Sequence, residues 1–165
     1  DLIFTMADDI SRTDMLGEMD FRYNLPLDCR VIGNEGLLTS VVTNLTKNAR
    51  AYSQGTQVGL ELIGRNQNFY TFSFYDNGVG VENEHLPHLF ERFYRIDTGR
   101  ARKSGGTGLG LPIVKSSINS MGGSITVRNR KGGGLEFIFT LRRAQDDKEA
   151  GTPAQPVATS DDSGD

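Results

Sequence analysis

The chain has 165 residues, of which 36% are hydrophobic and 24% are charged, and its formal net charge is −3. This length suits one domain with a hydrophobic core and excludes two full-sized domains. Because no run of about 18 apolar residues occurs and no apolar leader opens the chain, the sequence predicts neither a membrane span nor a signal peptide. Cys29 is the single cysteine and cannot form an internal disulfide, which is consistent with a reducing compartment.

Residues 1–16 carry apolar residues at roughly helical spacing between polar runs, and we interpret them as the end of an upstream helix or as a linker. The main domain is then expected over residues 17–145. Within it, residues 20–25 alternate in polarity before Pro26, which predicts a first strand. Asn34 precedes a wide apolar stripe at helical spacing, so we expect Asn34 to cap a long helix.

Two asparagines interrupt the edge of this apolar stripe. Asn44 and Asn48 are four residues apart and therefore lie on one face of the predicted helix. Asparagine is a poor helix former and is uncommon in cores, so the pair suggests amide oxygens directed at a cation or a phosphate. The alternative is that both amides simply face water.

A β-hairpin is predicted over residues 57–64 and 69–75, which alternate in polarity around a polar turn. Asp76 follows directly, in step with the core-facing phenylalanines of the second strand, so it would end on the buried side. A buried carboxylate needs a partner. Residues 77–80 contain two glycines that allow a flat or charged ligand to approach closely, with an ordinary turn as the alternative.

Basic side chains gather further along the chain. Residues 82–95 predict short helical turns, and residues 98–106 have the composition of a mobile lid. The basic cluster suits a polyanion such as a triphosphate better than duplex nucleic acid, which would need a broader basic face. A solvated charged loop is the alternative. The cluster comprises Arg92, Arg95, Arg100, Arg102 and Lys103.

Residues 105–114 pass from a glycine-dense loop into an apolar helical pattern, with Pro112 in the first turn. Backbone N–H groups in such a loop and at a helix N-terminus bind phosphate, although a plain glycine-rich turn is the alternative. A second hairpin is predicted by residues 124–128 and 135–141. Residues 146–165 hold six acidic residues and one lysine without periodicity, which predicts a disordered acidic tail.

Several familiar site patterns are absent from the sequence. It contains neither the P-loop pattern G-x-x-x-x-G-K-[ST] nor the dinucleotide-binding pattern G-x-G-x-x-G, and it lacks the H-R-D and D-F-G motifs of eukaryotic-type kinases. The two histidines, His85 and His88, have no third ligand at a recognisable spacing, so a zinc site is not expected.

Four separated segments resemble, in order and in spacing, the nucleotide-binding boxes of sensor histidine kinases. The resemblance covers about residues 20–142, and four boxes in register are far more specific than any single one. Residues 44–52 resemble the asparagine box, residues 76–80 the first glycine box, residues 90–95 the phenylalanine box and residues 106–111 the second glycine box.

This resemblance implies a Bergerat-type α/β fold, an α+β two-layer sandwich in which helices cover one face of a mixed, mostly antiparallel sheet. ATP and Mg²⁺ are the implied ligands. Asp76 would accept a hydrogen bond from the adenine amino group, and Gly78 and Gly80 would let the purine lie close. Asn48 is the implied magnesium ligand, Asn44 would lie near the phosphates, and Tyr52 would pack beside the base or sugar. The implied phosphate-binding residues are Gly106, Thr107, Gly108, Leu109 and Gly110, with Arg95, Arg100 or Lys103 from the lid.

The implied activity is that of a protein-histidine kinase, which transfers the γ-phosphate of ATP to a histidine on a separate dimerisation domain. No such acceptor motif occurs in this chain. The implied partners are the upstream dimerisation and phosphoacceptor domain and a response regulator receiver domain, within a homodimeric parent protein. Neither nucleic acid nor membrane contact is expected of this domain, which would be cytoplasmic even where the parent lies in the inner membrane.

One position departs from the family pattern, because Ala51 stands where Lys or Arg is usual and Arg50 comes one residue earlier. A shift of one residue turns a side chain by about 100° around a helix. A weak kinase, or a pseudokinase that binds nucleotide and docks partners, is therefore one alternative. A non-kinase ATPase of the wider superfamily is another, although the helix that carries Asn44 offers no suitably placed carboxylate for hydrolysis.

Overall fold

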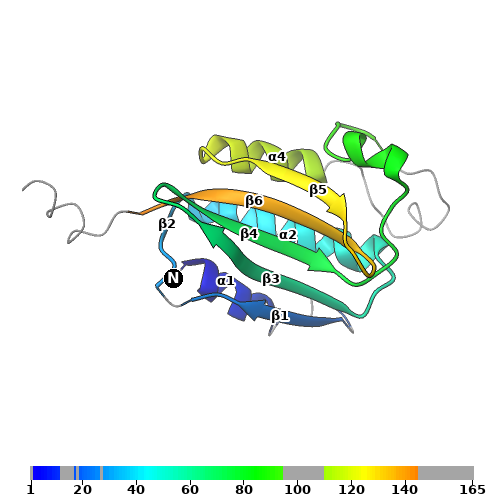
Figure 1. Cartoon of the computed structure of the whole chain (residues 1–165), viewed down its shortest axis with the longest axis horizontal. Helices are drawn as coiled ribbons and strands as arrows, with labels where there is room; N and C mark the ends of the chain where they lie inside the picture. The colour runs from blue at the N-terminus through cyan, green and yellow to red at the C-terminus, as the bar shows by residue number, and fades with distance from the viewer. Residues whose placement is uncertain (1, 12–16, 18, 27, 95–109, 145–165) are drawn as a thin grey trace, which may run out of the picture.

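The computed structural model describes residues 2–11, 17, 19–26, 28–94 and 110–144 (Figure 1). Its elements alternate between helices and strands, as expected for an α/β chain. In chain order they are α1 (Leu2–Ser11), β1 (Asp20–Asn24), β2 (Val31–Ile32), α2 (Glu35–Tyr52), β3 (Gln57–Arg65), β4 (Phe69–Asp76), the 3₁₀-helix η2 (Asn83–His88), α4 (Gly110–Ser120), β5 (Ile125–Asn129) and β6 (Leu135–Arg143).

The strands of this described part form one six-stranded sheet, in which β3 lies between β1 and β4, and β4 lies between β3 and β6. The other edge of β6 pairs with β2 near its end and with β5 near its start. Among the described strands, β1 and β3 are parallel and every other pair is antiparallel. The mixed, mostly antiparallel sheet predicted above is confirmed.

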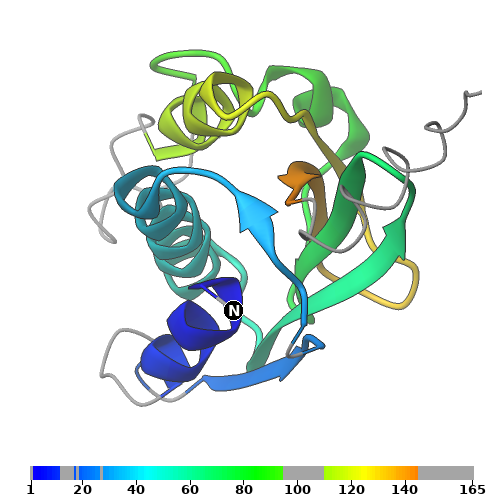
Figure 2. The same ribbon diagram turned by 90° about the vertical axis from the view of Figure 1, so that its left-hand side faces the viewer.

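Helices α1, α2 and α4 lie together on one face of the sheet (Figure 2). The core lies between the two layers, where Leu38 and Leu45 of α2 meet Phe72 of β4 and Phe139 of β6, all at most 1% exposed. The rings of Phe72 and Phe139 stack with their centroids 5.4 Å apart. The two-layer architecture is therefore that of the predicted sandwich.

Local signals explain the main helix boundaries. The Asn34 side chain accepts a hydrogen bond from the Leu37 N–H at 3.0 Å and caps α2 as predicted. Helix α4 begins at Gly110, carries Pro112 in its first turn, and ends before Gly122, whose φ of +83° favours glycine. The N-terminal segment forms α1, and its residues Ile3, Met6 and Ala7 are buried in the same core as α2 and the sheet.

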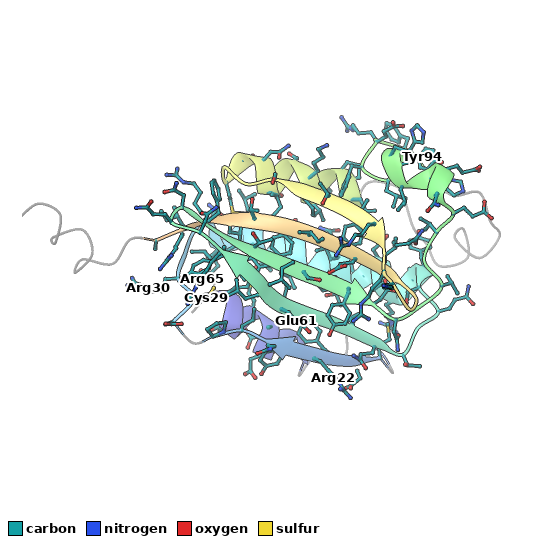
Figure 3. The ribbon with its side chains drawn as sticks, in the orientation of Figure 1. Arg22, Cys29, Arg30, Glu61, Arg65 and Tyr94 are labelled. Carbon is teal, nitrogen blue, oxygen red and sulfur yellow. The ribbon has the colours of Figure 1, made fainter. Side chains whose placement is uncertain are left out.

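The second face of the sheet carries a polar network rather than helices. Tyr75 of β4 lies over Gly59 of β3, and its hydroxyl donates a hydrogen bond to Glu61 at 3.2 Å. Glu61 is labelled on this face of the sheet in Figure 3. The Arg130 guanidinium stacks on the Tyr75 ring, with its Cζ 3.9 Å from the ring centroid. These contacts leave Tyr75 only 7% exposed without a covering helix. Among the described residues, no helix is long and apolar enough to cross a membrane.

Candidate functional site

Asp76 ends β4 on the core side of the sheet, as its position in the sequence predicts, and is only 5% exposed. Its Oδ1 accepts hydrogen bonds from the backbone N–H groups of Gly78 at 2.9 Å and Leu135 at 3.3 Å. Within the described part of the chain, Oδ2 accepts none. Burial raises the pKa of Asp76 above its usual value, while the two N–H donors and the positive charge of Arg130 oppose this rise. The result is a buried carboxylate with one oxygen left to accept a donor.

The turn after Asp76 is joined to the end of α2 and to the start of β3. Asn77 accepts hydrogen bonds from the N–H groups of Thr56 at 2.9 Å and Gln57 at 3.0 Å. The Val79 N–H donates to the Ser53 carbonyl at 2.8 Å, directly after the last residue of α2. A Cβ atom on Gly78 would lie 2.0 Å from this same carbonyl oxygen, so only glycine fits there. The glycine at this position thus has a packing reason that is independent of any ligand.

Asn44 of α2 faces the first residue of α4. Its amide nitrogen donates to the Ser40 carbonyl at 2.8 Å, and its oxygen lies on the side of Gly110, 3.3 Å from where a Cβ of that glycine would be. The amide oxygen of Asn44 therefore lies beside the first residue of α4. Asn48 and Tyr52 follow along α2, and both are half-buried. Asn44 and the start of α4 are thus brought together, and Asn48 and Tyr52 lie one and two turns further along α2.

Most of the predicted phosphate-binding segment lies outside the described residues. This applies to residues 95–109, and the predicted acidic tail at 146–165 is also outside the description. The first part of the phenylalanine box is described, and its Phe90 packs edge-on against Phe137 of β6 with ring centroids 6.1 Å apart. The predicted site residues that lie outside are Arg95, Arg100, Lys103, Gly106, Thr107, Gly108 and Leu109.

The hairpin between β5 and β6 supplies contacts to the Asp76 turn that the sequence pattern does not predict. Asn129 at the end of β5 accepts a hydrogen bond from the Val81 N–H at 3.0 Å and donates one to the Val81 carbonyl at 2.7 Å. Gly134 has a φ of +97°, and a Cβ there would lie 2.0 Å from the Asp76 carbonyl oxygen. The sequence predicts a hairpin over residues 124–128 and 135–141 but not these contacts, because the partner residues lie 48 and 59 positions away in the sequence.

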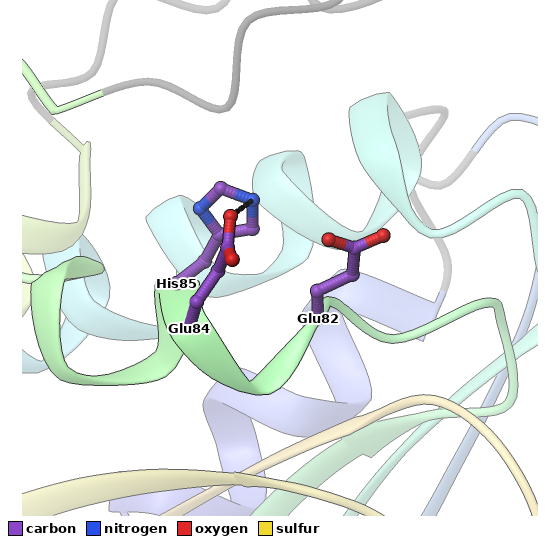
Figure 4. Close-up of side chains that lie close together, drawn as sticks. All are labelled: Glu82, Glu84 and His85. Atoms are coloured by element: carbon purple, nitrogen blue, oxygen red, sulfur yellow. Dashed lines mark ion pairs between the residues drawn. The ribbon is translucent and has the colours of Figure 1, made fainter.

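A second group of polar side chains lies around η2, where ligand atoms of Glu82, Glu84 and His85 fall within 4.8 Å of one another (Figure 4). His85 Nε2 is 3.8 Å from a Glu84 carboxylate oxygen, and its Nδ1 shares a hydrogen bond with the Tyr94 hydroxyl at 2.5 Å. The His88 ring stacks on Tyr94 with centroids 5.1 Å apart. Both carboxylates are exposed, and such groups often lie close together without a metal, so this arrangement by itself does not define a metal site.

Comparison with known proteins places these features in a family context. Residues 33–145 match the family described as histidine kinase-, DNA gyrase B- and HSP90-like ATPases. The sensor-like histidine kinase SenX3 of Mycolicibacterium smegmatis is 40% identical over 117 residues, which cover 70% of this chain and 30% of SenX3. The sensor histidine kinase WalK of Bacillus subtilis is 36% identical over 137 residues, which cover 80% of this chain and 22% of WalK. The chain therefore spans less than a third of the length of these relatives.

Solved structures agree with this match. Full-length ShkA in complex with AMPPNP superposes with a TM-score of 0.68 at 27% identity, covering 88% of this chain and 30% of ShkA. The mycobacterial sensor histidine kinase MprB superposes with a TM-score of 0.69 at 24% identity, covering 86% of this chain and 92% of that one. The second likeness supports the fold alone.

Proposed function

The chain belongs to the family of histidine kinase-, DNA gyrase B- and HSP90-like ATPases, and from this premise we propose that it binds Mg-ATP and delivers the γ-phosphate to a histidine on a separate domain. Its similarity to SenX3 and WalK identifies it as the ATPase domain of a sensor histidine kinase. The proposed acceptor lies on the dimerisation domain of a homodimeric parent, and the proposed final recipient of the phosphate is a response regulator receiver domain.

The observation that carries this proposal is the state of Asp76. Two backbone N–H groups fix Oδ1, and Oδ2 is left without a donor in the described structure. A carboxylate oxygen accepts a hydrogen bond from the exocyclic amino group of adenine, whereas the carbonyl oxygen of guanine at that position would repel it. The oxygen of Asp76 without a donor among the described residues supports the proposal that this residue selects adenine.

The other end of the proposed site suits phosphate and magnesium. Asn44 presents its amide oxygen beside Gly110, and the N-terminus of α4 provides N–H groups and the positive end of the helix dipole. Asn48 lies one turn further on the same helix and is the proposed protein ligand of Mg²⁺, which takes few protein ligands and keeps phosphate oxygens and waters. When bound, Mg²⁺ would neutralise charge on the transferred phosphoryl group.

The residues of this chain contribute position and charge rather than a base or a nucleophile. Asp76 and its turn would hold the adenine, and the α2 and α4 ends would hold the phosphates in line with the acceptor. The proposed neutralising cations are Arg95, Arg100 and Lys103. The only carboxylate on α2 is Glu35 in its first turn, far from Asn48, so hydrolysis without an acceptor is disfavoured. Ala51 favours a second candidate, a module that binds nucleotide and docks partners without phosphotransfer.

Calorimetric titration with AMPPNP, with and without Mg²⁺, tests this proposal. We expect binding that strengthens with Mg²⁺ and weakens at least tenfold in Asp76→Asn, the change of about 1.4 kcal/mol that losing one charge-assisted hydrogen bond produces. Asp28→Asn removes an exposed carboxylate elsewhere and serves as the matched control, with unchanged affinity expected. Failure of the unchanged chain to bind AMPPNP with Mg²⁺ would overturn the proposal. If it binds but no phosphate reaches the histidine-bearing domain of the parent, the docking candidate is preferred.

A further inference from the structure

Asn129 joins the end of β5 to the loop that follows the Asp76 turn. Its side-chain oxygen accepts the Val81 N–H at 3.0 Å, and its side-chain nitrogen donates to the Val81 carbonyl at 2.7 Å. The same nitrogen is 3.2 Å from Oδ1 of Asn83, at the start of η2. Both backbone groups of Val81 are therefore satisfied by one side chain that is 48 residues away in the sequence.

Few side chains could make this pair of contacts. An amide presents an acceptor and a donor side by side, which matches the N–H and C=O of one residue, whereas a carboxylate would offer acceptors only. The loop also passes very close to Asn129, since a Cβ on Gly80 would lie 2.5 Å from its Oδ1. Gly80 has a φ of +69°, so both its conformation and this contact require glycine.

The other strand of the same hairpin holds Asp76, because Leu135 pairs with Asn129 at the turn end of the hairpin. The Leu135 N–H donates to Asp76 Oδ1 at 3.3 Å, and Gly134 lies against the Asp76 carbonyl. The segment from Asp76 to Val81 is therefore fixed at both ends by the β5–β6 hairpin. Loss of the Asn129 contacts would free one end of a segment whose other end is the adenine-reading carboxylate.

We propose that Asn129 is a positioning residue for adenine recognition, because it fixes the loop that follows Asp76. This inference rests on the proposed function. Asn129 acts through the Val81 backbone and the Asp76 turn, without contact to the nucleotide. It belongs to the base end of the site and not to the phosphate end at α4, so its removal should affect ATP and ADP equally.

The test compares three variants by calorimetry, with AMPPNP and with ADP, each in the presence of Mg²⁺. Asn129→Ala removes both contacts, and we expect about tenfold weaker binding of both ligands, equivalent to about 1.4 kcal/mol. Asn129→Ser keeps a group that donates and accepts, and we expect it to recover part of the affinity. Val127→Ala is the matched control on the same strand, since Val127 packs on the core and its apolar side chain cannot make the hydrogen bonds that Asn129 makes to Val81.

Thermal unfolding of each variant separates positioning from stability. We expect Val127→Ala to lower Tm and leave both affinities unchanged, because it removes packing and keeps the loop contacts. Amide hydrogen exchange of Val81 should accelerate in Asn129→Ala and stay slow in Val127→Ala. Three results would overturn the inference: parental affinity in Asn129→Ala, an equal loss of affinity in Val127→Ala, or a loss confined to AMPPNP. Absence of binding by the unchanged chain would instead overturn the proposed function, and this inference with it.

Discussion

Gly134 offers a sharp test of how the hairpin supports Asp76, because a second glycine of the same turn provides a matched control. Gly134 and Gly132 have nearly equal φ values, +97° and +93°. A Cβ on Gly134 would lie 2.0 Å from the Asp76 carbonyl oxygen and 2.7 Å from its Oδ1, whereas a Cβ on Gly132 would meet nothing within 4 Å. Alanine at either position therefore causes similar backbone strain, and only Gly134→Ala also disturbs Asp76.

The structure sets the expected size of each effect. A residue other than glycine in this backbone conformation costs about 1–3 kcal/mol, and both variants should lose about that much stability. Real Cβ atoms essentially never come within 3.0 Å of such an atom, so Gly134→Ala must move Asp76 or the hairpin by about an ångström. A displacement of that size removes the alignment that a hydrogen bond to adenine needs, and we expect at least a tenfold increase in the Kd for AMPPNP.

Urea denaturation and calorimetry on the two variants make the comparison. We expect Gly132→Ala to be less stable than the parent with an unchanged Kd for AMPPNP, and Gly134→Ala to lose both more stability and at least tenfold in affinity. Equal losses of stability together with equal affinities in the two variants would refute the reasoning, because the contact with Asp76 would then have no consequence.

Three further predictions concern charge and capping. Burial raises the pKa of Asp76, so Asp76→Asn should increase Tm at neutral pH. This gain in Tm should shrink as the pH falls through the raised pKa and vanish below about 3.9, the pKa of an unfolded aspartate. A gain that does not change with pH would contradict this prediction. Burial alone would raise the pKa of Glu136, but hydrogen bonds from Ser73 and Arg128 lower it overall. Glu136→Gln should therefore lower the free energy of unfolding in urea by about 1–2 kcal/mol at neutral pH, and by progressively less on acidification. A loss of stability that stays constant with pH would argue against the ionic contribution. Asn34→Ala should lower the free energy of unfolding by about 1 kcal/mol through loss of the α2 cap. The calorimetric Kd for AMPPNP should stay unchanged, because Asn34 lies at the far end of α2 from Tyr52. Weaker binding would show that the cap affects the nucleotide site.

The parts of the fold that depend on local chemistry could be predicted from the sequence. The cap at Asn34, the first helical turn at Pro112 and the inward direction of Asp76 each follow from the residue type and from the helix or strand period. The structure confirms all three. The family could also be predicted, because four boxes occur in the expected order and spacing, and that spacing reflects contacts between the boxes that a single box does not show.

Contacts between segments distant in the sequence could not be predicted in this way. The two-residue strand β2 is too short to show a period. The parallel pairing of β1 with β3 depends on the crossover connection through α2, which local residue patterns do not reveal. In the sequence, Asn129 is recognisable only as a polar residue before a hairpin turn, because its contact with Val81 depends on the fold. The three consecutive glycines at residues 132–134 are more than a hairpin turn needs, and this excess indicates that one of them contacts another segment.

With the proposed role of Asp76 in adenine recognition, the environment of this residue sets recognition against stability. Burial makes the ionised carboxylate unfavourable, and two N–H groups with the nearby Arg130 only partly compensate, since the pKa remains raised. Filling the second oxygen with an internal donor would stabilise the empty domain but remove the acceptor that the proposed recognition of adenine requires. A carboxylate with one oxygen lacking a hydrogen-bond donor is therefore expected of a binding residue. The two N–H groups, Asn129 and Gly134 form the structure that holds this unfavourable charge in position until a ligand donates to it.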